Sequence, residues 1–263
     1  TIRRPINKGY DFGAHAVSLK AAGIDKNGLS DYNHVLFMNC GVTGPFIPNY
    51  VDEHWTELFF KKLNVNNVKL VGSSIACLKK DDLGGEGPKV EGFLFAMDRE
   101  TVCEVWAQKT IFTDHESKEA VIVNGEYGLS NFILKKGYNL DCMNYRYKGL
   151  NWQDRKNWKC NNCEFASRPN ANDGVSMSPF ETIFQKTKWA HKNKTVRGDE
   201  VAKYVKWAMD REHTLQDYVP QMEYIYIVDE KDKNQFEWTV PLLVGSIVFL
   251  VFMFVICLIT AKN

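Results

Sequence analysis

The chain has 263 residues, with 33 basic and 32 acidic side chains, and 44% of its residues are hydrophobic. This length and composition are typical of a globular protein with one sizeable domain or two small ones, and they argue against global disorder. A formal net charge of +1 argues against a nucleic-acid partner, because such a protein needs a basic surplus to neutralise phosphates.

Short apolar runs alternate with helical patterns along the first part of the chain. Runs rich in β-branched and aromatic residues, too short for helices, predict strands at 34–40, 68–76, 90–98 and 139–145. Apolar residues at helical spacing predict helices at 52–63, 99–108 and 126–137, the last before a glycine stop. Strands interleaved with helices predict an α/β sandwich.

The pattern changes after residue 147. Residues 148–178 predict a long irregular loop, a feature that is usually functional or mobile in a compact domain. A short helix or turn (179–189), an amphipathic helix (199–213), a last strand (224–228) and a polar stalk (229–237) are expected to follow.

Residues 238–261 carry no charged side chain, and Trp238 and Lys262 flank them. At about 1.5 Å per residue this run spans roughly 36 Å, which is enough for a hydrocarbon core of about 30 Å. It predicts a single C-terminal transmembrane helix whose partner is the lipid bilayer; the alternative is a buried core helix. No N-terminal signal peptide is visible, so a tail anchor with a cytoplasmic domain is the default, although flanking lysines leave the side open.

Four segments carry candidate site residues. In the first, Arg4, Asn7 and Asp11 surround Gly9, so its backbone and polar groups would suit a sugar or ribose; the alternative is a helix-capping turn. In the second, Asn39 ends a buried strand, where open α/β sheets bind ligands, or else belongs to a polar turn.

The third and fourth segments add charged groups. Glu126 stands at a helix start, where it would act as a general base or simply cap the helix. Glu181 is followed by Lys186 and Lys188, either of which would neutralise a leaving diphosphate or remain solvated. Cys160 and Cys163 have zinc-knuckle spacing but no second pair, which favours a disulfide or plain thiols.

The order of these motifs resembles a glycosyltransferase family of the GT-A type, close to a group found in algae, fungi and large DNA viruses. It is more distantly similar to rhamnan-synthesis and capsular-polysaccharide transferases. The resemblance covers roughly residues 3–190, and it rests on the segments 7–14, 32–46, 125–140 and 178–189.

The resemblance implies an α/β, Rossmann-like GT-A sandwich at 1–190, followed by a helical extension and stalk at 191–237. It implies a nucleotide-sugar donor and a glycan or protein acceptor, with Glu126 as the catalytic base. The implied donor-binding residues are Arg4, Asn7, Gly9, Asp11 and Asn39. The implied acceptor-side residues are Asp98, Trp152, Glu181 and Lys186, although Asp98 would otherwise start a helix and Trp152 would otherwise pack in the core.

Three departures from the family pattern stand beside the resemblance. Asn39 replaces a metal-binding Asp, which argues against a divalent metal, and Tyr127 replaces the usual catalytic Asp. The chain also begins at a segment that normally follows a nucleotide-binding β-α-β unit, so the fold is expected to be N-terminally truncated, or the unit precedes Thr1.

Two further functions remain open at this stage. A degenerate GT-A-like domain would serve as a membrane-tethered structural protein, for example a minor capsid component in a viral protein assembly. A sugar-binding module would bind glycans without turnover.

Overall fold

The computed structural model describes residues 8–163, 165–166, 171, 177–186 and 255–259. They form a mixed α/β fold around a mixed five-stranded sheet with the strand order β7-β3-β6-β1-β9. The alternation of strands and helices in the sequence predicted this class correctly. Its strands are β1 (His34–Met38), β3 (Val68–Gly72), β6 (Leu94–Asp98), β7 (Asn139–Cys142) and β9 (Val255–Ile259).

The directions of the strands place the carboxyl ends of three of them along one side of the sheet, and this side is called the edge below. Both β1 and β3 pair antiparallel with β6, and β7 pairs parallel with β3. The carboxyl ends of β1, β3 and β7 therefore lie at the same edge, where β6 begins.

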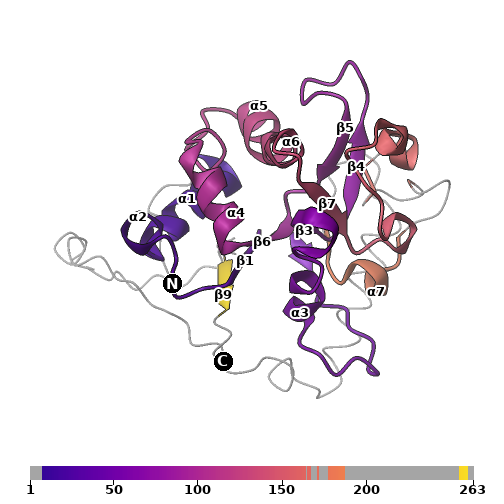
Figure 1. Cartoon of the computed structure of the whole chain (residues 1–263), viewed down its shortest axis with the longest axis horizontal. Coiled ribbons are helices and arrows are strands. Elements are labelled where there is room, and N and C mark those ends of the chain that lie inside the picture. The colour runs from indigo at the N-terminus through magenta and orange to yellow at the C-terminus, as the bar shows by residue number, and fades with distance from the viewer. Residues whose placement is uncertain (1–7, 164, 167–170, 172–176, 187–254, 260–263) are drawn as a thin grey trace, which may run out of the picture.

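Helices cover both faces of this sheet (Figure 1). Alternate side chains of β1 point to opposite faces, so Val35 and Phe37 belong to one apolar cluster and Leu36 to the other. The first cluster includes side chains from α1 (Tyr10–Ala21), α4 (Arg99–Ala107) and α6 (Tyr127–Lys135), and the second includes side chains from α3 (Trp55–Phe60). Strands buried on both faces explain the near-continuous apolar runs in the sequence.

Two predicted strands are each broken by a turn. Residues 68–76 divide at Ser73 and Ser74 into β3 and β4 (Ile75–Leu78), and the run 90–98 divides into β5 (Gly87–Val90) and β6. The strands β4 and β5 form a separate antiparallel hairpin. Single long strands were therefore wrong here, because continuous burial hides the points at which the chain leaves the sheet.

The remaining elements are short. They are α2 (Ile24–Asn27), α5 (Lys118–Ala120), α7 (Pro179–Thr182), β2 (Val42–Thr43), β8 (Gln185–Lys186), a π-helical turn η2 (Val121–Glu126), and the 3-10 turns η1 (Val65–Asn67), η3 (Tyr145–Tyr147), η4 (Arg155–Trp158) and η5 (Cys160–Cys163). A disulfide joins Cys77 of β4 to Cys160, so the partner of Cys160 comes from a distant part of the chain.

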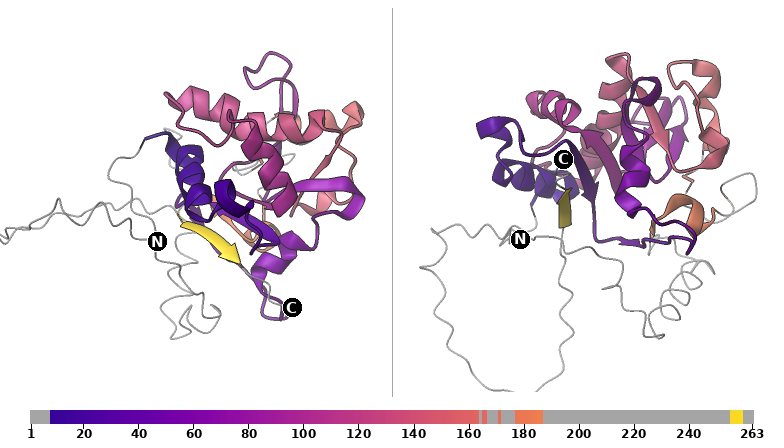
Figure 2. Two further views of the ribbon diagram at one scale, coloured as in Figure 1. Left: turned by 60° about the vertical axis from the view of Figure 1, so that its left-hand side comes forward. Right: turned by 60° about the horizontal axis from the view of Figure 1, so that its bottom comes forward.

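The predicted transmembrane segment 238–261 lies outside the described residues except for Val255–Ile259. These residues form β9, which pairs antiparallel with β1, so the expected helix is replaced by a strand over this stretch (Figure 2). A run of apolar and β-branched residues suits the outermost strand of a sheet as well as a helix. Among the described residues, no helix has the length and apolar character needed to cross a membrane. The predicted elements at 199–213, 224–228 and 229–237 lie outside the described residues.

Candidate functional site

The edge of the sheet at which β1, β3 and β7 end gathers polar groups from distant parts of the sequence. Asn39 follows β1, Ser73 and Ser74 follow β3, and the segment Glu91–Phe93 leads into β6. The register pairs Met38 with Leu94 and Gly72 with Phe95, so these ends are aligned. Ligands of open α/β sheets bind outside such carboxyl ends.

Asp11 and Asn39 meet at this edge. The Asn39 side-chain amide donates a 2.8 Å hydrogen bond from Nδ2 to Oδ2 of Asp11. The Asn39 carbonyl oxygen accepts the Gly41 amide at 2.9 Å, and its own backbone amide donates to the Phe93 carbonyl at 3.0 Å. Burial raises the pKa of Asp11, while the Asn39 hydrogen bond and the positive charge of Lys186 act in the opposite direction.

Glu126 comes from the junction between the π-helical turn η2 and α6. Such π turns are rare, and they often occur at functional sites. The Glu126 side chain caps no helix; its Oε1 accepts the Gly92 backbone amide at 2.8 Å. Burial raises the pKa of its carboxyl group, and the charges of Glu91 and Asp11 add to this effect. Lys186 and the Gly92 amide favour the charged carboxylate and partly offset the rise.

Lys186 connects the two carboxylates electrostatically. It lies in β8, which pairs with β2 shortly after Asn39 in the chain, and its ammonium lies 5.6 Å from the centre of the Phe93 ring. Its positive charge acts on both Asp11 and Glu126. The structure thus brings together Asp11, Asn39, Glu126 and Lys186, four predicted site residues from four separate segments.

Asp98 lies at the opposite edge of the sheet from these residues. Its carboxylate forms a 2.7 Å ion pair with Lys69 and caps α4 by accepting the Thr101 amide at 2.8 Å. Burial alone would raise the pKa of Asp98, but the hydrogen bonds from Lys69 and Thr101 outweigh it and hold this pKa below its usual value. Asp98 therefore has the helix-starting role, and its predicted place beside an acceptor is not found at this edge.

Trp152 is fully buried, with 0% of its surface exposed, and its ring packs edge-on against Tyr147. The prediction that it stacks on an acceptor sugar is corrected by this burial, because a large apolar ring is more stable in the core. Glu181 lies in α7, where its Oε1 accepts the Tyr145 amide at 2.7 Å, just beyond the end of β7. It shares the edge, although its carboxylate is engaged with the backbone.

The remaining donor-side predictions fall at the start of the chain. Arg4 and Asn7 lie outside the described residues. Gly9 has a left-handed φ of 75° before α1, and a Cβ there would come within 2.6 Å of the Asp114 Cα. A glycine is required at this position by the close packing and by the left-handed turn. This agrees with the alternative that the segment is a helix-capping turn.

The contacts of Asn39 do not suit a ligand of a divalent metal. Within the described part of the chain, no group of three His, Cys, Asp or Glu side chains is arranged to hold one. The amide nitrogen of Asn39 faces Asp11 and its oxygen already accepts a backbone amide, so this side chain does not replace a metal-binding carboxylate.

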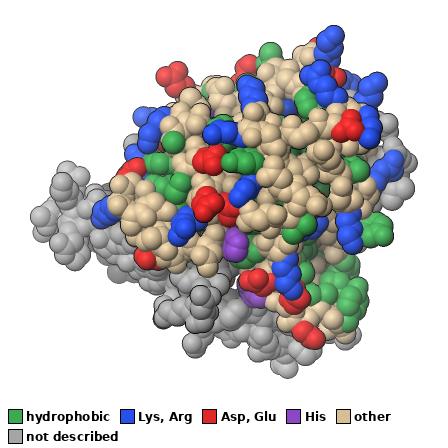
Figure 3. Space-filling view, in the orientation of Figure 1, with side chains coloured by type: hydrophobic (Ala, Val, Ile, Leu, Met, Phe, Trp, Pro, Cys, Tyr) green, Lys and Arg blue, Asp and Glu red, His purple; other side chains and the backbone are tan. Residues whose placement is uncertain are grey.

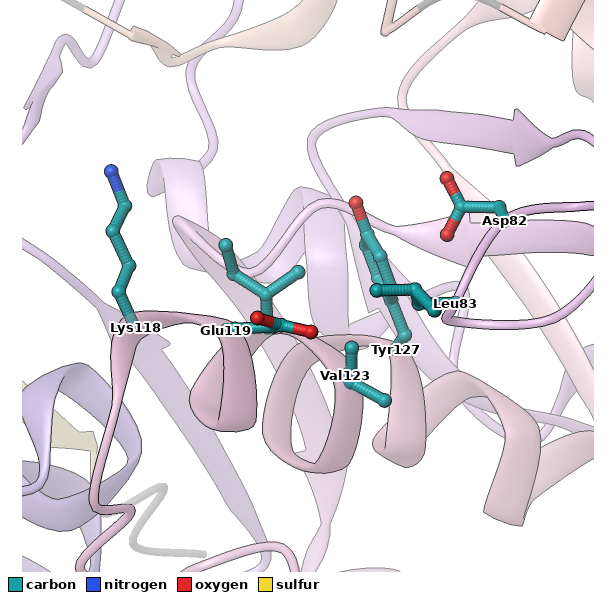
Figure 4. A pocket seen from close by; sticks show the side chains of 7 residues that line it. Asp82, Leu83, Lys118, Glu119, Val123 and Tyr127 are labelled. Carbon is teal, nitrogen blue, oxygen red and sulfur yellow. The ribbon is translucent and has the colours of Figure 1, made fainter.

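A separate shallow hollow lies between the Asp82–Leu83 loop and the α5–η2 segment (Figure 4). Tyr127 forms one wall, and Lys118 and Glu119 stand at its other end. None of the predicted site residues that the structure describes lines it. Lysine and arginine side chains gather on the nearby surface over the β4–β5 hairpin (Figure 3).

Four further residues lie at this edge that were not predicted from the sequence, namely Ser74, Glu91, Gly92 and Phe93. A glycine inside an apparent strand, here Gly92, is the one signal from which this turn could have been predicted. His15 of α1 is 1% exposed, and neither of its ring nitrogens has a hydrogen-bond partner among the residues that the structure describes.

Comparison with models of known protein families, with curated proteins and with solved structures finds no significant match to this chain. Function is therefore inferred from the chemistry of the site.

Proposed function

We propose that the chain is a membrane-anchored glycosyltransferase with a GT-A-like fold, which transfers a sugar from a nucleotide-sugar donor to a hydroxyl of a glycan or protein acceptor. The observation that supports this proposal is the convergence of Asp11, Asn39, Glu126 and Lys186 at one edge of the sheet. A half-buried carboxyl group of raised pKa beside a lysine is a common feature of acid–base sites.

Glu126 is the general base in this proposal. It removes the proton of the acceptor hydroxyl while the acceptor oxygen attacks the anomeric carbon and the bond from that carbon to the diphosphate breaks. The proton ends on Glu126, and the diphosphate leaves with the bonding electron pair. A single displacement of this kind inverts the anomeric centre. The raised pKa makes Glu126 a stronger base than an exposed glutamate, and the Lys186 charge favours its ionised form.

Asp11 and Asn39 supply groups that suit sugar hydroxyls. The Asp11 carboxylate has acceptor capacity beyond its bond to Asn39, and the Asn39 amide carries a second N–H donor. Lys186 contributes positive charge towards the leaving diphosphate. The membrane anchor is proposed from the uncharged run 238–261 in the sequence, and it requires that residues 255–259 leave their pairing with β1 when the run enters the bilayer.

The test is turnover by the full chain, purified in detergent and offered a panel of nucleotide-sugars with and without Mg²⁺ or Mn²⁺. Release of nucleoside diphosphate is measured for the wild type, for Glu126→Gln and for the exposed control Glu116→Gln. We expect turnover in the wild type and the control, and a loss of about 10²–10⁴-fold in Glu126→Gln.

The absence of both turnover and nucleotide-sugar binding by calorimetry would overturn the proposal. Binding of glycans that is independent of nucleotide would then identify a sugar-binding module. If neither ligand binds, a structural role in a membrane-bound assembly becomes the better account.

A further inference from the structure

The segment Glu91–Phe93 contacts three of the residues gathered at the edge of the sheet. The Gly92 amide donates to Oε1 of Glu126 at 2.8 Å, and the Phe93 carbonyl accepts the Asn39 amide at 3.0 Å. The Phe93 ring lies 5.6 Å below the Lys186 ammonium. One short turn between β5 and β6 thus orients residues that come from three other segments.

This turn is itself held by a buried polar pair. Glu91 is 2% exposed and Ser74 is 0% exposed. The Ser74 hydroxyl donates to Oε2 of Glu91, and the Glu91 amide donates to the Ser74 carbonyl at 3.2 Å. A buried carboxylate is costly unless it is hydrogen-bonded, so its presence in this turn calls for a role.

The space around Gly92 links the turn to the position of Glu126. A Cβ added at Gly92 would lie 2.8 Å from Cγ and 2.9 Å from Cδ of Glu126. Any side chain at this position must therefore displace the Glu126 carboxylate from the Gly92 amide. The Val90 amide of β5 also donates to the Ser130 hydroxyl oxygen of α6 at 2.9 Å, which ties β5 to the helix that follows Glu126.

We propose that Glu91 and Ser74 are positioning residues, which hold the 91–93 turn so that the Gly92 amide fixes the Glu126 carboxylate beside Lys186. The assignment of Glu126 as the base rests on the proposed function, whereas the positioning is a property of the folded chain. Three charged groups act on Glu126: Lys186 from β8, Asp11 from α1 and Glu91 from the turn. His115 lies against the neighbouring Gly125.

The experiment follows the Glu126 carboxyl directly, by ¹³C NMR of the full chain labelled at glutamate, with its resonance assigned by its loss in Glu126→Gln. Removing the Glu91 charge in Glu91→Gln is expected to lower the titration midpoint of Glu126, because a like charge that disfavours its ionised form is gone. Glu86→Gln, in the exposed loop of the same hairpin, is the matched control and is expected to leave the midpoint unchanged.

Two further variants test the hydrogen bond. In Ser74→Ala, the Gly92 amide proton is expected to move upfield as its bond to Glu126 lengthens, and Ser74→Thr, which restores the hydroxyl, is expected to return it. If Glu91→Gln does not fold, Gly92→Ala serves instead, because its Cβ should displace Glu126 while the helices and sheet persist by circular dichroism.

An unchanged Glu126 midpoint in folded Glu91→Gln, together with an unchanged Gly92 amide in Ser74→Ala, would overturn the inference. So would a Gly92→Ala variant that folds and leaves the Glu126 resonance and midpoint as in the wild type. If the resonances shift as expected and no variant turns over a nucleotide-sugar, the positioning stands and the proposed function fails.

Discussion

The pKa values of acidic side chains shift in opposite directions at the two ends of the sheet. At the end where β6 finishes, Asp98 is paired with Lys69 and caps α4, so its pKa is lowered. At the other end, Asp11 and Glu126 are half-buried, and Lys186 interacts electrostatically with both of them. The pKa of each of these two carboxyl groups is raised.

This difference separates acidic groups that stabilise the fold from acidic groups whose ionisation lowers the stability of the fold. A carboxylate with its own cation and a helix amide contributes to stability at neutral pH. A buried carboxylate beside others lowers stability when it ionises, and such groups are concentrated at functional sites. The predictions below test whether each group belongs to its assigned class.

His15 is the extreme case of burial, because its ring nitrogens have no hydrogen-bond partner in the described part of the chain. Its ring is surrounded by Phe12, Phe37, Phe95 and Phe112, and burial lowers its pKa to about 3. Above pH 6.5 it is neutral in both states; below this, the unfolded chain takes up a proton that the folded chain refuses. We expect it to remove roughly 4–5 kcal/mol of stability between pH 6.5 and 3.

Chemical denaturation at pH 7 and pH 4 checks this prediction through the difference between the wild type and His15→Leu. The variant should lose less stability on acidification. An equal loss in both proteins would show that His15 does not remain neutral in the fold.

Asp98→Asn removes the charge of a group assigned to stability. We expect a loss of about 2 kcal/mol at pH 7, because Lys69 is left largely buried without its partner, and no loss of site function. Since the folded pKa of Asp98 is below its unfolded value, the difference from the wild type should shrink as the pH falls below about 4. Unfolding of both proteins in urea at pH 7 and pH 3 measures this difference in stability.

Glu126→Gln makes the same chemical change at the other end of the sheet. The resulting change in folding stability should have the opposite sign to that of Asp98→Asn. The folded state holds the proton of Glu126 more tightly than the unfolded state does, so ionisation at neutral pH costs stability. We expect a gain of about 1 kcal/mol at pH 7 that disappears in acid, together with the loss of function described above. A destabilised variant at pH 7 would place Glu126 with Asp98 among the stabilising groups.

Asn39→Asp should give the smallest effect. It replaces the hydrogen bond from Asn39 to Asp11 by two facing carboxylates, which costs about 0.5–1 kcal/mol at neutral pH. Protonation relieves this repulsion, so stability should approach that of the wild type near pH 4. Thermal unfolding across this range checks it, and Asn33→Asp on the exposed surface is the control.

Most of the strands and helices could be predicted from local pattern. The run at 34–40 and the helix at 99–108 were placed within a few residues, because burial and helical spacing leave a periodic mark in the sequence. The same continuous burial concealed the turns at Ser73–Ser74 and Glu91–Phe93, where two runs that look like single strands change direction.

The candidate site shows the same division. The sequence by itself determined the fold class and singled out Asp11, Asn39, Glu126 and Lys186 as candidate site residues. Only the tertiary structure decided that these four meet, that Asp98 lies at the opposite edge, and that Trp152 is in the core. The physical reason is that pairing across the sheet sets which ends share an edge, and contacts between distant residues leave no periodic signal in the chain.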